Sequence, residues 1–289
     1  MAVVAVIAAA AIVVASRGSS KSASPTTTKT PTTAARSARQ ILAAASARTR
    51  AAGTARMSMV ETVSGSGVSF DLNLNGASDY AHKNSEITMS ALGRDFETVR
   101  VVSGVSYMSA PGVALPGNAH WVSLRPSDLG LPSNQSALGS NDPNTGLQYL
   151  SAISGSPHDL GAATIDGAPT THYGFTVDLR SLMDQMSRGM SKLGGQSLGL
   201  GEMNGLLDLT NIPAEAWIDH DGRVRQFKFT LAMSTLGQSV KAVSTMKYSH
   251  FDEPLTITAP APTDVVPFSS VPQFFQQLGQ NAASNGFTA

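Results

Sequence analysis

Several segments of this chain alternate apolar and polar residues with a period of two, and this pattern constrains the fold more than any other feature. Residues 68–75 read VSFDLNLN, and residues 172–179 (HYGFTVDL) and 226–233 (QFKFTLAM) repeat the alternation. Successive side chains of a β-strand point to opposite faces of a sheet, so each segment predicts a strand with one apolar and one solvated face. Strands of this kind are typical of antiparallel sheets that are covered on one side.

Turn residues indicate how these strands are connected. Asp166-Gly167 and Asp221-Gly222 each lie between two strand-like segments, and this residue pair is favoured in hairpins where both central residues have positive φ. We therefore expect about ten or more strands in one large, curved antiparallel sheet rather than a parallel βαβ array. Further candidate strands are residues 54–63, 87–92, 96–103, 104–109, 120–124, 162–166, 214–219, 239–248 and 254–258.

Four segments are predicted to be helical. Residues 34–52 are rich in Ala and Arg and are followed by Gly53, which favours a first helix. Residues 142–153 begin with Asp-Pro, an N-cap followed by a proline at the first helical position. Residues 181–193 carry apolar side chains at intervals of three, four and three, which predicts an amphipathic helix, and a short helix is expected around residues 271–278. The apolar side chains of the amphipathic segment are Met183, Met186, Met190 and Leu193.

The N-terminal segment predicts export. Residues 2–15 (AVVAVIAAAAIVVA) are uncharged and apolar, and as a helix they would extend about 21 Å against roughly 30 Å of bilayer hydrocarbon. The segment matches the apolar region of a secretory signal, although no positive region precedes it. Residues 16–33 are rich in Ser, Thr and Pro and lack apolar anchors, which predicts a solvated tether.

The charge distribution argues against binding to nucleic acid. Residues 1–60 carry eight Lys and Arg and no acid, whereas the remainder carries twelve bases and twenty acids. A negative body lacks the cationic face that neutralises phosphates. We therefore expect an extracytoplasmic protein that is tethered to the cell membrane or secreted. Its expected parts are a signal or anchor segment (1–15), a disordered linker (16–33), a sheet domain (34–268) and a C-terminal tail with a short helix (269–289).

Several kinds of chemistry have no sequence support. The chain has no cysteine, so it has no disulfide, thiol nucleophile or Cys-zinc site. Its six histidines form no i,i+4 pair, and no G-x-S-x-G nucleophile elbow occurs. We expect no catalysis, no metal and no cofactor.

A set of ordered motifs covers roughly residues 35–265 and is structural in kind: a capped helix, hairpins and a D-G-x-x-R turn. The motifs are Asp142-Pro143 with Leu147 and Leu150, residues 165–173 (IDGAPTTHY), 177–179 (VDL), 212–219 (IPAEAWID) and 221–225 (DGRVR). Together they resemble the exported actinobacterial lipoproteins of the LppX/LprG type, which belong to the LolA-like superfamily. The family's lipidated Cys is replaced by Ser16 after Val13-Val14-Ala15, so no thioether lipid can form there.

The resemblance implies an α+β fold in which an antiparallel half-barrel wraps around a few helices. It also implies an apolar cavity between sheet and helices that holds the acyl chains of a lipid or lipoglycan. Methionines suit such a site because their unbranched side chains repack around ligands of different shape. The residues expected to line the cavity from the sheet are Phe70, Leu72, Leu74, Tyr173, Phe175, Phe227, Phe229 and Leu231, and those expected to close it are Met183, Met186 and Met190.

The leading hypothesis is a non-enzymatic, monomeric protein that binds or carries a hydrophobic envelope molecule. Its partners would be that lipid and the membrane surface or the envelope export machinery. One alternative is a sensing, signalling or structural module of the same fold that acts through protein contacts, which a filled interior would favour. The other is a cell-wall enzyme using Asp71, Asp178 or Asp219, although these carboxylates fall at solvent-facing or hairpin positions where no burial would raise the pKa of a general acid.

Overall fold

The computed structural model describes residues 33–65, 68–129, 147, 149–178, 180, 211–235, 238–271, 273–274 and 277. Twelve strands in this part of the chain form a single sheet. The strands are β1 (Thr54–Gly65), β2 (Val68–Asp79), β3 (Asn84–Ala91), β4 (Arg94–Val102), β5 (Val105–Ser109), β6 (Trp121–Leu124), β7 (His158–Ile165), β8 (Ala168–Val177), β9 (Ile212–Asp219), β10 (Val224–Thr235), β11 (Gln238–Ser249) and β12 (Val265–Pro267). The helices are α2 (Thr33–Arg50) and the short 3-10 helices η1 (Pro116–Asn118), η2 (Pro126–Leu129), η3 (Tyr149–Ala152), η4 (Pro262–Asp264) and η5 (Phe268–Ser270).

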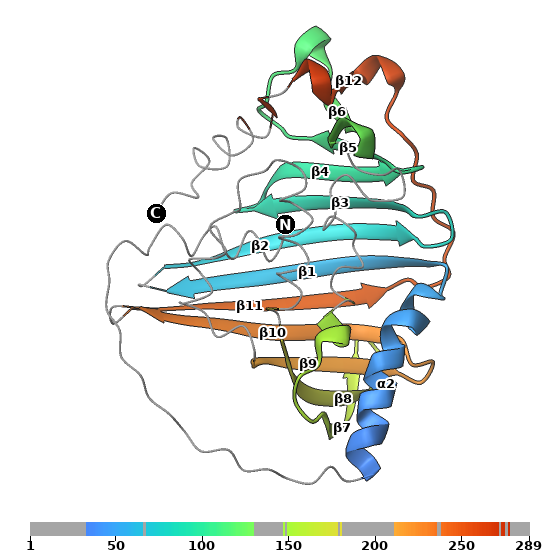
Figure 1. Ribbon diagram of the computed structural model, residues 1–289, viewed down its shortest axis with the longest axis vertical. Coiled ribbons are helices and arrows are strands. Elements are labelled where there is room, and N and C mark those ends of the chain that lie inside the picture. The colour runs from blue at the N-terminus through green and yellow to red at the C-terminus, as the bar shows by residue number, and fades with distance from the viewer. Residues whose placement is uncertain are drawn as a thin grey trace.

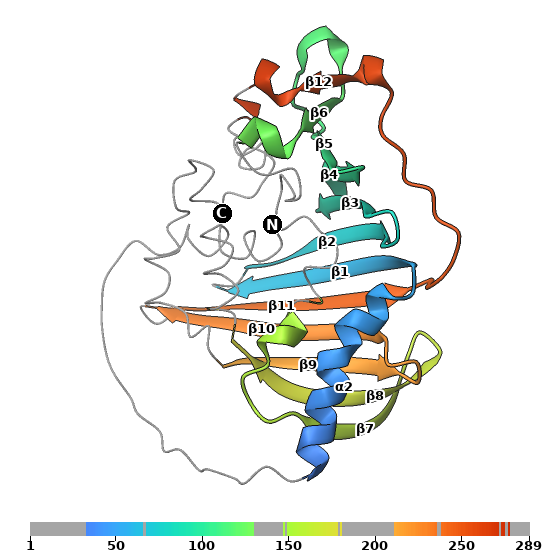
Figure 2. The ribbon, with the colours of Figure 1, turned by 45° about the vertical axis from the view of Figure 1, so that its right-hand side comes forward.

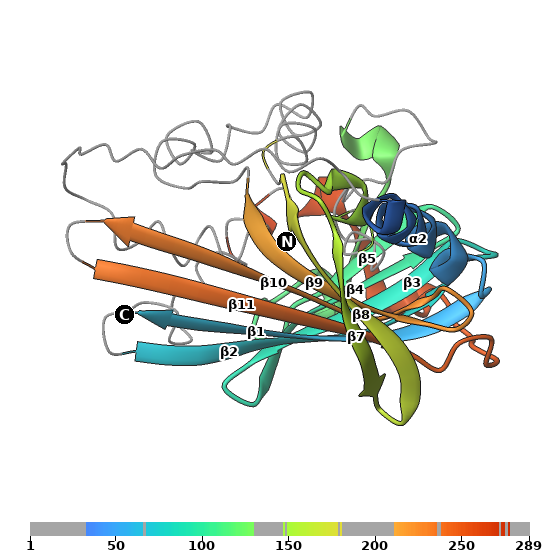
Figure 3. The same ribbon diagram turned by 90° about the horizontal axis from the view of Figure 1, so that it is seen from below.

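The sheet has the order β12-β6-β5-β4-β3-β2-β1-β11-β10-β9-β8-β7 (Figure 1). All neighbouring strands are antiparallel except β12, which runs parallel to β6. Strands that are consecutive in the chain pair in two runs, β1 to β6 and β7 to β11, and these runs are joined where β11 pairs with β1. The sheet is strongly twisted and curved, and its two edge strands do not pair with each other, so it stays open (Figure 3). The predicted large, curved antiparallel sheet and the α+β class are therefore confirmed.

Tight turns between adjacent strands follow from residues that tolerate positive φ. Asp166 (φ 47°) and Gly167 (φ 82°) connect β7 to β8 as predicted. Ser103-Gly104 makes the same kind of turn between β4 and β5, with φ values of 50° and 79°. The prediction for Asp221-Gly222 was wrong in one respect, because only Gly222 has positive φ there. The carboxylate of Asp219 shapes that turn instead by accepting hydrogen bonds from the backbone N–H groups of Asp221 and Arg223.

The two faces of the sheet differ as the alternation predicts. On β1, Met57, Met59 and Val63 are buried, whereas Val60 between them is 41% exposed. We call the side with the buried residues the inner face and the other side the outer face. Cross-strand partners lie on the same face of an antiparallel sheet, so the register extends the inner face from β8 to β6.

Helix α2 crosses the inner face over the β7 to β10 half of the sheet (Figure 2). It buries Leu42 and Ala45 completely, which is the consequence of apolar residues recurring on one side of the helix. Thr49 joins its last turn to the sheet, because the Thr49 hydroxyl donates to Ala45 O (2.8 Å) and accepts from Val224 N–H (2.9 Å). Arg39 donates to Ile153 O and Gly155 O, so the same helix also holds the segment after η3.

Some predicted boundaries were wrong. β2 does not end before Gly76 but continues to Asp79. The strand can continue because Gly76 has no side chain that would collide with β3. A Cβ at Gly76 would lie 2.8 Å from the carbonyl oxygen of Glu86. Residues 254–258 are not a strand, whereas β12, which was not predicted, pairs with β6. The predicted first helix is confirmed as α2.

Other predicted helices lie wholly or partly outside the described residues. This applies to residues 181–193, including Met183, Met186 and Met190, and to half of residues 142–153, of which Leu147, η3 and Ile153 are described. Of residues 271–278, the structure describes a helical Phe274 and a helical Gln277, whose N–H donates to Gln273 O over 2.9 Å. The predicted signal and linker, residues 1–33, are also outside the described part, apart from Thr33, which begins α2.

Candidate binding site on the inner face

The structure brings all eight predicted lining residues of the sheet to the inner face. On β2, Phe70, Leu72 and Leu74 lie opposite Val63, Glu61 and Met59 of β1. The register places the remaining five on the same side through β11, β10, β9 and β8. These five are Tyr173, Phe175, Phe227, Phe229 and Leu231. Phe70 and Leu74 are half-buried, and the other six predicted lining residues are buried.

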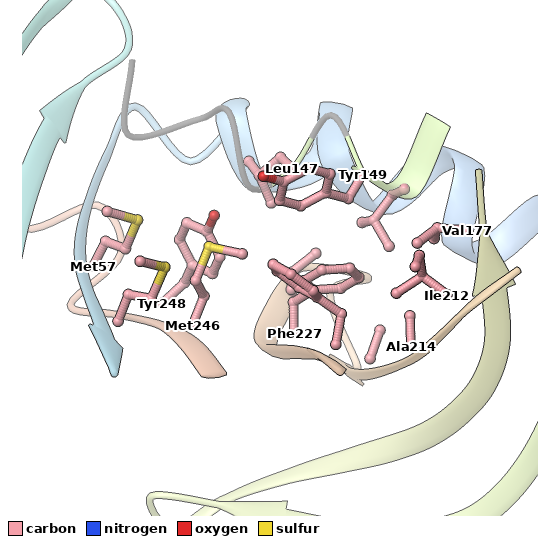
Figure 4. Packing of buried hydrophobic residues seen from close by; sticks show 14 of the residues in the cluster. Met57, Leu147, Tyr149, Val177, Ile212, Ala214, Phe227, Met246 and Tyr248 are labelled. Carbon is pink, nitrogen blue, oxygen red and sulfur yellow. The ribbon is translucent and has the colours of Figure 1, made fainter. Parts of the chain in front are cut away.

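An aromatic cluster fills the inner face beside α2. Tyr149 of η3 stacks on Phe227 with ring centroids 5.7 Å apart and meets Phe229 edge-on at 5.2 Å (Figure 4). Phe175 lies 6.1 Å from Phe227. Such aromatic pairs stabilise a core beyond the burial of their area. At this end of the sheet the predicted lining residues therefore pack against the protein's own side chains.

Methionines that were not predicted populate the inner face of the middle strands, and one of them, Met246, borders the aromatic cluster opposite Phe227. Three of them share one cross-strand row, in which Met59 lies opposite Met246 on one side and Leu74 on the other. Leu74 in turn lies opposite Met89. The alternation of residues 54–63 places Met57 and Met59 on one side of a strand, but Glu61, the next residue on that side, interrupts the apolar pattern. The buried methionines of the inner face are Met57, Met59, Met89, Met108 and Met246.

A buried glutamate lies in the middle of this methionine-rich area. Glu61 of β1 is 1% exposed and lies opposite Ser244 of β11 and Leu72 of β2. The Ser244 hydroxyl donates to Glu61 Oε2 over 3.1 Å, whereas Oε1 is buried without a hydrogen-bond partner. Burial raises the pKa of Glu61 from 4.5 to about 7, and the Ser244 hydrogen bond offsets part of this effect. Burial also raises the pKa of the Tyr149 hydroxyl, and the charge of Glu61 raises it further.

A second buried glutamate lies on the inner face of β4. Glu97 is 1% exposed and lies opposite Met89 of β3. Its Oε1 is buried without a hydrogen-bond partner, and burial raises its pKa from 4.5 to about 7. Sequence reasoning missed both glutamates because a charged residue in a strand is ordinarily assigned to the solvated face.

The carboxylates considered as catalytic candidates have structural partners and do not lie together. Asp71 is exposed on the outer face and accepts a hydrogen bond from Thr62 (2.7 Å). Asp178 follows β8 and accepts from Arg180 N–H (2.9 Å). The expectation of a position without burial was wrong for Asp219, which is buried at the end of β9 and accepts a hydrogen bond from Arg225 Nε over 2.7 Å. None of these three carboxylates has the orphaned, buried oxygen that Glu61 and Glu97 share.

Two further observations bear on the chemistry of the described part of the chain. No group of three or more His, Cys, Asp or Glu side chains within it is placed to hold a metal ion. No helix within it combines the length and the hydropathy needed to cross a membrane.

No protein-family model and no curated protein sequence matches the chain. Among solved structures, LprF from Mycobacterium bovis is similar with a TM-score of 0.39 and 17% identity, covering 78% of this chain and 98% of that chain. The lipoprotein LppX from Mycobacterium tuberculosis gives 0.37 and 14%, covering 76% and 99%. A LolA-superfamily protein from Nitrosomonas europaea gives 0.30 and 11%, covering 77% and 97%. At TM-scores this low the likeness assigns no family, but LppX-type and LolA-superfamily proteins, which the sequence motifs resemble, are among the structures to which this chain is similar.

Proposed function

We propose that this protein is an exported, non-enzymatic binder or carrier of a hydrophobic envelope molecule, and that the inner face is its binding surface. The ligand would be the acyl chains of a lipid or lipoglycan. The N-terminal apolar run and the Ser/Thr/Pro-rich segment that follows it support an extracytoplasmic location, with the protein either tethered or secreted.

The observation that carries this proposal is the composition of the inner face over β1 to β5 and β11. Methionine supplies five of its buried side chains, and an unbranched thioether side chain adapts to apolar surfaces of different shape. Burial of each ligand methylene contributes about 0.8 kcal/mol, so one acyl chain supplies useful affinity without a charged contact. Helix α2 contacts the other half of the sheet, at β7, β9 and β10.

Lipid content and lipid uptake test the proposal. Protein purified from its own host is expected to carry an acyl-chain ligand that native mass spectrometry detects and solvent extraction releases. Protein stripped of lipid is expected to take up a pyrene-labelled fatty acid with saturable fluorescence. Absence of both a co-purified lipid and probe uptake contradicts the proposal.

The packed aromatic cluster of Tyr149, Phe227 and Phe229 favours a second candidate function, a sensing or structural module that acts through protein contacts. In this second function the buried side chains of the inner face stabilise the fold and bind no ligand. The two functions give opposite results in the same uptake experiment, because a module of this kind takes up no fatty acid.

A further inference from the structure

Two buried carboxyl groups interrupt a mainly apolar region of the inner face, where Ser244 and Ser106 are also buried. Glu61 and Glu97 are each 1% exposed, and each has one carboxyl oxygen that is buried without a hydrogen-bond partner. Their cross-strand neighbours on β2 and β3, Leu72 and Met89, cannot donate to them. Buried polar groups are almost always paired in folded proteins, so these two carboxyl oxygens, like the unpaired Ser106 hydroxyl on the same face, call for an explanation.

Packing alone does not require these glutamates. Methionine has nearly the same length and already occupies the flanking inner-face positions Met59 and Met89. An apolar side chain at either position would fill the same space without the cost of desolvating a carboxyl group. The carboxyl groups are therefore suited to a partner that is not part of the described chain.

The chemistry of that partner follows from the protonation of the two groups. Burial raises both pKa values to about 7, so both protonation states are populated near neutral pH. A charged carboxylate needs a donor and a protonated carboxyl also offers one. A hydroxyl group both donates and accepts, so it pairs with either state.

We propose that Glu61 and Glu97 bind hydroxyl groups of an amphiphile whose hydrocarbon part lies along the methionines of the inner face. This proposal rests on the proposed function, since it names the polar chemistry of the same site. The two glutamates lie three strands apart with an offset of two residues, which places their strand positions roughly 15 Å from each other. A ligand with several hydroxyl groups along an extended chain can therefore bind both glutamates, and a ligand with a single hydroxyl group can bind one of them.

Two isomeric probes isolate the contribution of the hydroxyl group. Decan-1-ol and 1-methoxynonane have the same atoms, but only the alcohol can donate a hydrogen bond. Their affinities are measured by displacement of a pyrene-labelled fatty acid from the full-length protein. We expect the wild type to bind the alcohol about tenfold more tightly than the ether, as one additional hydrogen bond predicts.

Substitution by methionine tests the assignment to the glutamates. Glu61→Met and Glu97→Met, singly and combined, keep the apolar surface, and the combined variant is expected to bind both isomers equally. Glu86→Gln is the matched control, because Glu86 lies on the outer face of β3, where it pairs with Arg100. This control is expected to keep the wild-type preference for the alcohol. Circular dichroism establishes that each variant is folded.

The outcomes separate this inference from the proposed function. Equal binding of both isomers by the wild type, or a preference for the alcohol that persists in the folded double variant, overturns the role of the glutamates and leaves hydrophobic binding in place. If the wild type binds neither the fluorescent fatty acid nor either of the two isomers, both this inference and the proposed function are overturned.

Discussion

Glu61 and Ser244 face each other across β1 and β11, and the Ser244 hydroxyl donates to Glu61 Oε2 over 3.1 Å while Glu61 Oε1 stays without a hydrogen-bond partner. The pair lies on the inner face, with Leu72 on the opposite side of Glu61. One hydrogen bond satisfies only part of a carboxyl group that can accept several. The protein therefore keeps a group in its interior that is easier to bury protonated than ionised.

This burial predicts that stability falls as pH rises through the weakly acidic range. The pKa values of Glu61 and Glu97 are raised from 4.5 to about 7 in the folded protein. Below pH 4.5 both groups are protonated in the folded and unfolded states, whereas between pH 4.5 and 7 the folded state binds more protons. Each group is therefore expected to lower the free energy of unfolding by about 3 kcal/mol between these limits. Urea denaturation at a series of pH values measures the slope.

The Glu61→Gln/Glu97→Gln double variant is expected to lose this slope, because neither glutamine titrates. Glu86→Gln removes an outer-face carboxylate and is expected to leave the slope as in the wild type. A double variant with the wild-type slope would assign the pH dependence to other groups.

The alternation was sufficient to predict the sheet and the inner-face positions of β2, β8 and β10. In residues 226–231, for example, Phe227, Phe229 and Leu231 form a strictly alternating set, and all three are buried on the inner face. The prediction succeeded here because period two is a local property of the backbone. The turn at Asp166-Gly167 was predicted from a different local signal, a residue pair in which both members adopt positive φ.

The polar part of the candidate site could not be predicted in the same way. A glutamate within a strand reads as an outer-face residue, and only the register of β1 with β2 and β11 places Glu61 inside. The pairing of β11 with β1 joins residues nearly two hundred positions apart in the chain, and no local pattern specifies such a contact. The short parallel strand β12 was missed because three residues are too few for a periodicity to show.

A charge on the inner face is expected to abolish lipid uptake. Leu74 is half-buried between Met59 and Met89, so Leu74→Asp places a carboxylate where the hydrocarbon of a ligand would lie. We expect uptake of a pyrene-labelled fatty acid to fall about tenfold or more, since an unpaired charge is costly beside an acyl chain. Val60→Asp introduces the same group on the outer face, where Val60 is 41% exposed, and is expected to leave uptake unchanged. Equal uptake by both variants, each shown to be folded, would remove Leu74 from the binding surface.

Thr49 is expected to be important for docking of α2. Its hydroxyl bridges Ala45 O within the helix and Val224 N–H of β10, and the residue is fully buried. Thr49→Val keeps the shape but leaves the Val224 N–H without its acceptor, which should cost about 1–3 kcal/mol in the free energy of unfolding. Urea denaturation measures the loss. Thr62→Val is the matched control, because Thr62 bonds to Asp71 on the exposed outer face, and its effect should stay within about 0.5 kcal/mol. Equal losses in the two variants would show that the helix is held by apolar contacts alone.

Gly76 is expected to resist even the smallest side chain. A Cβ at this position would lie 2.8 Å from the carbonyl oxygen of Glu86 and 3.2 Å from Cγ1 of Ile87, both on β3. Gly76→Ala must therefore push β2 and β3 apart, which should lower the free energy of unfolding by about 1–3 kcal/mol. Asn75→Ala changes the neighbouring, exposed residue of the same strand and should cost less than about 0.5 kcal/mol. Because Gly76 lies on the inner face opposite Met57, separation of the strands there should also weaken uptake of the fluorescent fatty acid. A Gly76→Ala protein as stable as the wild type would mean that the two strands can relax without loss of pairing.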